Sequence, residues 1–75
     1  MEVRIGVEHS PRELVLESSQ GQDEVEKAVA KALGSADGLL TLVDEKGRKV
    51  IVPAAKIAYV ELGEGEGRRV GFVAG

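Results

Sequence analysis

The alternation of apolar and polar residues predicts strands near the start of the chain. Apolar residues occupy every second position over residues 3–7, which is the period of a strand with one buried face. Pro11 interrupts the pattern, since proline has no N–H to donate to a neighbouring strand. The pattern resumes over residues 13–17, so the two segments are predicted to form an antiparallel hairpin with Leu14 and Leu16 facing the core.

The next segment has the period of an α-helix. Apolar residues recur at spacings of three and four over residues 25–33, and charged residues occupy the opposite side, as on a helix with one buried stripe. Gly34 is expected to close the helix in the left-handed conformation that glycine adopts readily. The sequence therefore predicts one helix over residues 22–33.

Two further apolar stretches, over residues 39–43 and 48–52, flank a short polar turn. Gly47 can adopt the positive φ that a type I turn with a bulge requires, so these stretches are predicted to form a second hairpin. Pro53 is expected to end its second strand. The remaining predicted elements are a short helical turn over residues 54–56, a strand over residues 57–62 and a last strand over residues 68–73.

The predicted order is β-β-α-β-β-β-β, which places one helix on one mainly antiparallel sheet. This is a two-layer α+β domain, and it matches a β-grasp arrangement by analogy of order alone. The 75 residues are expected to form a single domain over residues 1–75. A domain of this size buries only about 60% of the surface that its unfolded chain exposes. The pairing of the first strand is not determined by the sequence.

A sheet with one helix has only one covered face, and several apolar residues are predicted to lie on the other. These candidate interface residues are Val15, Ile51, Tyr59 and Val73. Charged residues normally occupy an open sheet face and its edges, whereas an apolar patch of a few hundred Å² tends to mark an interface. We therefore expect association with a second copy or with another protein. For Tyr59 packing on that face is favoured over an exposed contact, since aromatic rings usually bury most of their area.

The charge of the chain disfavours nucleic acid as a partner of its whole surface. Thirteen acidic residues and ten basic residues give a net charge of −3, whereas binding to polyphosphate depends on positive charge. The remaining candidate is a basic patch in the C-terminal half, formed by Arg48, Lys49, Arg68 and Arg69. With Tyr59 and Phe72 as the only aromatic residues, few bases could stack. Any binding of nucleic acid is expected to be weak and dependent on salt.

The glycine-rich segment Gly63–Gly67 is the one candidate for binding a nucleotide phosphate. Phosphate loops combine glycines with a following lysine, a hydroxyl and a helix N-terminus. This segment instead contains Glu64 and Glu66 and precedes a predicted strand. We interpret it as a flexible connector, and specific binding of ATP or GTP is not expected.

Catalytic and metal-binding patterns are also weak. The chain has no cysteine, and its single histidine, His9, occurs in a predicted turn without a recognisable nucleophile or orienting partner. No spacing of carboxylates matches a calcium loop, so we expect neither a cofactor nor a metal. No stretch resembles a signal peptide or a membrane helix, and a cytoplasmic location is expected.

Five segments carry a resemblance to a known family, and they are Glu2–Val7, Arg12–Glu17, Glu24–Val29, Asp44–Glu61 and Arg69–Phe72. Together they resemble the small actinobacterial proteins catalogued as domain of unknown function 3107, over nearly the full length. Some members are labelled ATP-binding, which the two glutamates of the glycine-rich segment argue against. The resemblance implies no functional residues.

These observations favour a non-catalytic protein-interaction module as the function. The first alternative is a small nucleic-acid-associated regulator that uses the basic patch. The second alternative is a nucleotide-binding protein.

Overall fold

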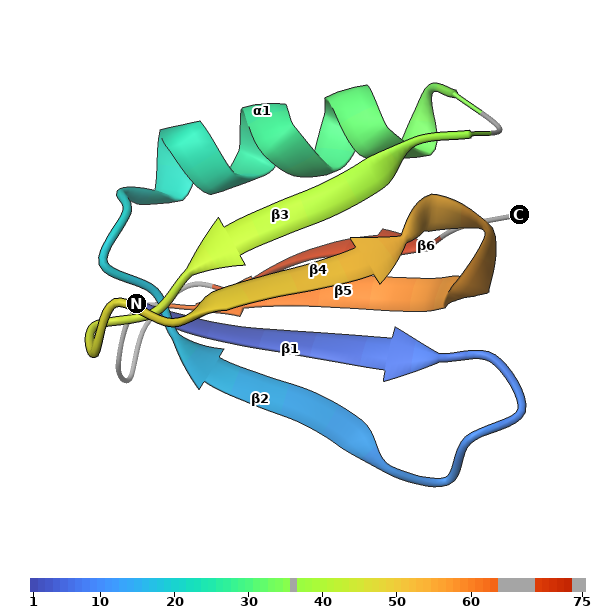
Figure 1. Cartoon of the computed structure of the whole chain (residues 1–75), viewed down its shortest axis with the longest axis horizontal. Helices are drawn as coiled ribbons and strands as arrows, with labels where there is room; N and C mark the ends of the chain where they lie inside the picture. The colour runs from blue at the N-terminus through green and yellow to red at the C-terminus, as the bar shows by residue number, and fades with distance from the viewer. Residues whose placement is uncertain (36, 64–68, 74–75) are drawn as a thin grey trace.

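The computed structural model describes residues 1–35, 37–63 and 69–73, without the side chains of residues 69, 70 and 72. Its elements follow the predicted order (Figure 1). They are β1 (Glu2–Val7), β2 (Glu13–Glu17), α1 (Gln22–Leu33), β3 (Leu39–Val43), β4 (Lys49–Pro53), the 3-10 turn η1 (Ala54–Lys56), β5 (Ile57–Gly63) and β6 (Arg69–Val73). Every strand pair among these residues is antiparallel. The predicted α+β class is confirmed.

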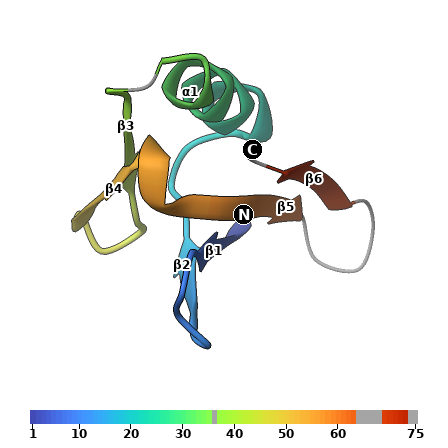
Figure 2. The same cartoon turned by 90° about the vertical axis from the view of Figure 1, so that its right-hand side faces the viewer.

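The strands form two sheets, whereas the sequence analysis predicted one. The larger sheet has the order β2-β1-β5-β6, and β3 and β4 form a separate two-stranded sheet. A single bridge between Ser18 and Asp44 joins the two sheets at one end. Figure 2 shows the two sheets on different sides of the molecule with α1 above the space between them. The core is thus enclosed from three sides, which one flat sheet beneath one helix would not achieve.

The core takes residues from both sheets, the helix and η1. Its buried apolar members are Val3, Ile5, Leu16, Val25, Val29, Ala32, Leu40, Leu42, Val52, Ala54, Ile57, Val60 and Leu62. The helical stripe is confirmed, since Val25, Val29 and Ala32 are buried. Leu14 departs from the prediction because 40% of its surface is exposed. It lies near the start of the outermost strand β2, at the end that projects away from α1 (Figure 1).

The predicted turn conformations are correct at one glycine and wrong at another. Gly47 has a φ of 84°, as the second hairpin requires. Gly34 has a φ of −79° and is right-handed. The Gly34 N–H makes an ordinary helical bond to the Ala30 carbonyl at 3.0 Å. The helix then ends through a tighter bond, in which the Ser35 N–H donates to the Ala32 carbonyl, three residues back, at 3.3 Å. Bonds of this kind satisfy the last carbonyls without a left-handed residue.

Gly38 fixes the position of the hairpin formed by β3 and β4. A Cβ atom at this position would lie 2.2 Å from the Ala32 carbonyl oxygen, so only glycine allows this approach of the chain to the end of α1. The Gly38 carbonyl also accepts a hydrogen bond from the Ala54 N–H at 2.9 Å. The helix consequently lies alongside the free edge of β3 (Figure 1), and a helix over an edge strand protects it from unwanted pairing.

Candidate functional site

The outward residues of β3 and β4 form an exposed and mainly apolar surface, which we call the hairpin face. They alternate with the inward residues of the same strands and are Leu39, Thr41, Val43, Lys49, Ile51 and Pro53. Leu39 exposes 60% of its surface and Ile51 exposes 55%. Since Thr41 pairs with Ile51 and Leu39 with Pro53, Leu39 and Ile51 are diagonal neighbours, roughly 7–8 Å apart. Lys49 is the single charged member of this face.

A groove of about 360 Å³ adjoins the hairpin face between α1 and β3. Leu39 and Thr41 line this groove as well, so the two surfaces are continuous. The other lining residues are mostly small, and they are Ala28, Lys31, Ala32, Ser35 and Gly38. A segment bound on the hairpin face could therefore reach the helix.

The helix-free face of the larger sheet, which we call the sheet face, mixes apolar and charged side chains. The strand register places Val15 beside Arg4, and Tyr59 beside Val73. Arg4 Nε lies 3.1 Å from Glu2 Oε1, and Arg4 Nη1 lies 3.8 Å from Glu13 Oε1. Contacts with carboxylates raise the pKa of Arg4, chiefly its hydrogen bond to Glu2. The ion pairs occupy part of this face, which makes it less suited to an apolar contact than the hairpin face.

Tyr59 packs on the sheet face. Its ring lies over Gly6, where an added Cβ atom would come within 2.1 Å of Tyr59 Cε2. Its hydroxyl donates a hydrogen bond to Glu13 Oε2. This bond, partial burial and the negative charge of Glu13 raise the pKa of Tyr59 above its usual value. The structure thus favours the packing alternative for this residue, which is half-buried.

The predicted interface residues divide between the two surfaces. Val15, Tyr59 and Val73 belong to the larger sheet, but Ile51 lies on β4, which pairs with β3 alone among the described strands. The expectation that all four residues lie on the uncovered face of one sheet is therefore wrong, because the hairpin forms its own sheet. Leu39 was missed. Its signal is Thr41, the polar residue of β3, which marks the outward positions of that strand.

The turn between β3 and β4 is organised by a buried carboxylate. Asp44 Oδ1 accepts the backbone N–H groups of Lys46 and Arg48 at 2.9 and 2.8 Å. Asp44 Oδ2 accepts Arg48 Nε at 2.7 Å. The backbone N–H of Arg48, then its side chain, hold the pKa of Asp44 below its usual value. Arg48 therefore has a structural contact in the turn, which also fixes the end of the hairpin face.

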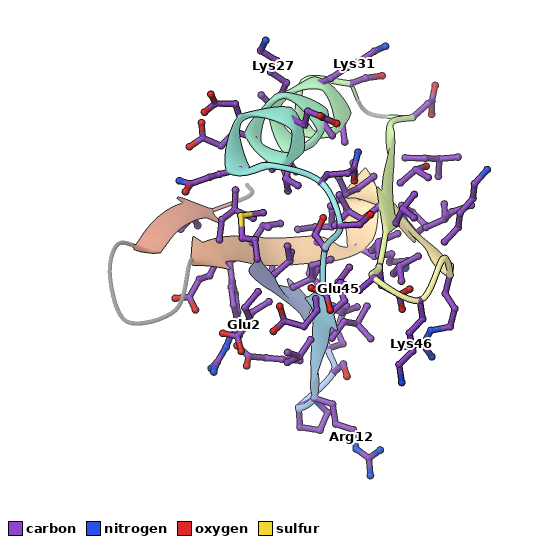
Figure 3. All side chains as sticks on the ribbon, turned by 90° about the vertical axis from the view of Figure 1, so that its left-hand side faces the viewer. Glu2, Arg12, Lys27, Lys31, Glu45 and Lys46 are labelled. Atoms are coloured by element: carbon purple, nitrogen blue, oxygen red, sulfur yellow. The ribbon has the colours of Figure 1, made fainter. Side chains whose placement is uncertain are left out.

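The structure describes only part of the predicted basic patch. Arg48 is bound to Asp44, and Lys49 is exposed on the hairpin face. Arg68 lies outside the described residues. For Arg69 only the backbone is described, and it pairs with Gly63. The patch thus stays a prediction. Other basic side chains are dispersed, since Figure 3 shows Lys27 and Lys31 on the helix, Lys46 at the hairpin turn and Arg12 at the far end of the molecule.

Groups suited to metal binding do not gather in the described parts of the chain. No cluster of three histidine or acidic side chains that could hold a metal occurs within residues 1–35, 37–63 and 69–73. His9 lies exposed in the turn after β1, with a positive φ of 62°. Residues 64–67 of the glycine-rich segment lie outside the described residues, so its interpretation is untested. No helix among the described residues has the length and apolarity needed to cross a membrane.

Comparison with protein-family models gives a match. A family model described as a protein of unknown function, DUF3107, matches residues 1–73. No curated protein matches the chain.

Proposed function

The chain belongs to the DUF3107 family of proteins of unknown function, and we propose that it is a non-catalytic module that binds other polypeptides through the hairpin face. The exposure of Leu39 and Ile51 as adjacent residues carries this proposal. Contiguous apolar side chains on an exposed face mark interaction sites more often than scattered ones do.

The size of the hairpin face favours an extended segment as its ligand. Strands of five residues are about 17 Å long, and two strands are about 10 Å wide. The flat footprint is therefore on the order of 170 Å², whereas a stable interface between domains needs about 800 Å² from each partner. An extended segment can add backbone hydrogen bonds at a strand edge to such a small apolar contact. The adjoining groove lengthens the surface available to it.

The distribution of reactive groups supports the non-catalytic part of the proposal. The chain has one histidine and no cysteine, and His9 is exposed in a turn. Glu13 forms an ion pair with Arg4, and Asp44 forms turn hydrogen bonds. Catalysis by acid–base or nucleophilic groups would require several of them to converge in one pocket.

A peptide-library selection tests the proposal directly. The purified chain is used to select from displayed random peptides, in parallel with the double variant Leu39→Thr, Ile51→Thr. Threonine has the β-branched shape that suits a strand, and exposed substitutions of this kind usually change stability by about 0.5 kcal/mol or less. The matched control is Val15→Thr, Val73→Thr on the sheet face.

We expect peptides that bind the wild type and the control but not the hairpin-face variant. The proposal is wrong if no peptide is enriched, or if the enriched peptides bind the hairpin-face variant as strongly as the wild type. If only the sheet-face control loses binding, the peptides bind the sheet face and not the hairpin face.

A further inference from the structure

At the free edge of β4, the backbone N–H and C=O groups of alternate residues point away from β3. The Asp44 N–H donates to the Arg48 carbonyl, and the Ala54 N–H donates to the Gly38 carbonyl, both at 2.9 Å. These bonds place the even-numbered residues of the hairpin in hydrogen-bonded pairs. Backbone groups in an antiparallel pair alternate in direction, so those of Lys49, Ile51 and Pro53 point outward from β4.

An independent contact on β3 confirms this direction. The Val43 carbonyl accepts the Ser19 N–H at 3.2 Å, so it points away from β4, as an odd-numbered residue of this register must. On β4 the corresponding outward groups have no strand partner among the described residues. The side chains of Lys49, Ile51 and Pro53 are all exposed. An edge of this kind is a template for pairing with another strand.

We propose that the segment bound at this edge is β4 of a second copy, paired antiparallel about a twofold axis at Ile51. This inference rests on the proposed function and names its partner. In this register the two Ile51 residues exchange both of their N–H···O bonds. Lys49 donates to the Pro53 carbonyl of the second copy, and no two like charges are opposite each other.

The sequence along β4 fits this twofold arrangement better than that along β2, an edge strand of the larger sheet. Twofold pairing of β2 about Val15 would place Glu13 opposite Glu17 of the second copy, and like charges directly opposite each other destabilise a strand pair. The Glu17 carbonyl already accepts the Glu45 N–H at 2.9 Å, so part of that edge is occupied. On β4, Lys49 is opposite an uncharged proline.

Pairing of this kind closes on itself. A twofold contact uses the same surface on both copies and stops at a dimer. The resulting sheet has four strands and a continuous outer face, on which Leu39 and Ile51 of each copy form one stripe. Five residues form a short contact, so the dimer exchanges with monomer, as interfaces below about 1,200 Å² usually do.

Cysteine cross-linking tests the register, and the absence of cysteine from the chain makes the test clean. Ile51→Cys is compared with Val15→Cys, which is a matched control because the two wild-type side chains expose 55% and 57% of their surface. Opposed residues of a hydrogen-bonded pair have Cα atoms about 5.5 Å apart, within the range that a disulfide spans. Under mild oxidation each pair of thiols loses two protons and two electrons to the added oxidant, glutathione disulfide, and forms one S–S bond.

We expect Ile51→Cys to form a covalent dimer about tenfold faster or more than Val15→Cys at equal concentration, because pairing raises the effective thiol concentration. Sedimentation velocity of the wild type should show monomer and dimer only. Ile51→Pro removes the outward N–H without removing a β3–β4 hydrogen bond, and it should raise the dimer dissociation constant about tenfold or more. Circular dichroism checks that its fold is retained.

Equal cross-linking rates for the two cysteine variants would overturn the inference, as would a wild type that stays monomeric throughout the concentration series. A wild-type dimer that persists in Ile51→Pro and does not cross-link through position 51 would also overturn it. In these cases peptides that still depend on Leu39 and Ile51 would leave the proposed function standing. Failure of both experiments would reject both proposals.

Discussion

Replacing Gly38 by alanine should loosen the contact between the helix and the hairpin. The added Cβ atom would lie 2.2 Å from the Ala32 carbonyl oxygen and 3.0 Å from its carbonyl carbon. Both atoms belong to the backbone of α1, so neither can rotate away as a side chain would. The start of β3 must therefore move from the helix.

The expected net cost follows from two opposing effects. Inserting a methyl group into a closely packed site costs about 1–3 kcal/mol. Exchanging glycine for alanine also stiffens the unfolded chain, which stabilises the folded state by about 0.4–1 kcal/mol. With central values of about 2 and 0.7 kcal/mol for the two effects, the net loss for Gly38→Ala is about 1 kcal/mol. In a domain of this size each kcal/mol lowers the midpoint of thermal unfolding by about 4–8 °C.

Thermal unfolding followed by circular dichroism measures this loss, with Gly71→Ala as the matched control. A Cβ atom at Gly71 would meet nothing within 4 Å, so that variant should unfold at or slightly above the wild-type temperature. The reasoning is refuted if Gly38→Ala unfolds at the same temperature as Gly71→Ala.

Three further predictions concern charged and titratable groups. The pKa of Asp44 is lowered in the folded state, so the stability that its ionised form contributes is complete above the usual pKa of 3.8 and is lost as the pH falls through the folded pKa. The difference in unfolding free energy between the wild type and Asp44→Asn should therefore shrink with acidification. A difference that does not change with pH would contradict this. Tyr59 is the only tyrosine, so the change in tyrosine absorbance with pH should give a pKa above 10.0, and Glu13→Gln should lower that pKa. If Glu13→Gln leaves the pKa unchanged, the hydrogen bond to Glu13 is not the cause of the raised value. Single-stranded DNA should bind weakly in fluorescence anisotropy, with an affinity that falls steeply with salt, because Arg48 is held by Asp44; tight, salt-resistant binding would contradict this.

The local elements could be predicted because each depends on residues close together in the chain. The helix extends over Gln22–Leu33 as predicted, since its apolar stripe and the glycine after it both mark its end. The outward direction of Ile51 also followed from alternation along one strand. These signals require no knowledge of what the element packs against.

The division into two sheets could not be predicted because it depends on contacts between distant segments. Alternation assigns residues to a face of a strand, but it does not say which strands are neighbours. The bridge between Ser18 and Asp44 and the close approach at Gly38 decide that arrangement. The same limit explains Leu14, whose exposure depends on where the helix and the hairpin end.

The candidate site was predictable only in part for a similar reason. Ile51 was identified as exposed, but its neighbour Leu39 resembles the core residue Leu40 that follows it. Only the pairing of β3 with β4 shows that Leu39 and Ile51 share a face. Tyr59 was placed on the correct strand face, and its packing depends on Gly6, a residue distant in the sequence.

The central claim is that the hairpin face is the surface through which this protein binds other polypeptides. Residue-resolved NMR of the ¹⁵N-labelled chain, recorded alone and with the most enriched library peptide, tests it most directly. The claim predicts that the largest shift changes occur at the backbone amides of Leu39, Thr41 and Ile51. Changes centred instead on Val15 and Val73 of the sheet face, with the hairpin amides unmoved, would contradict it.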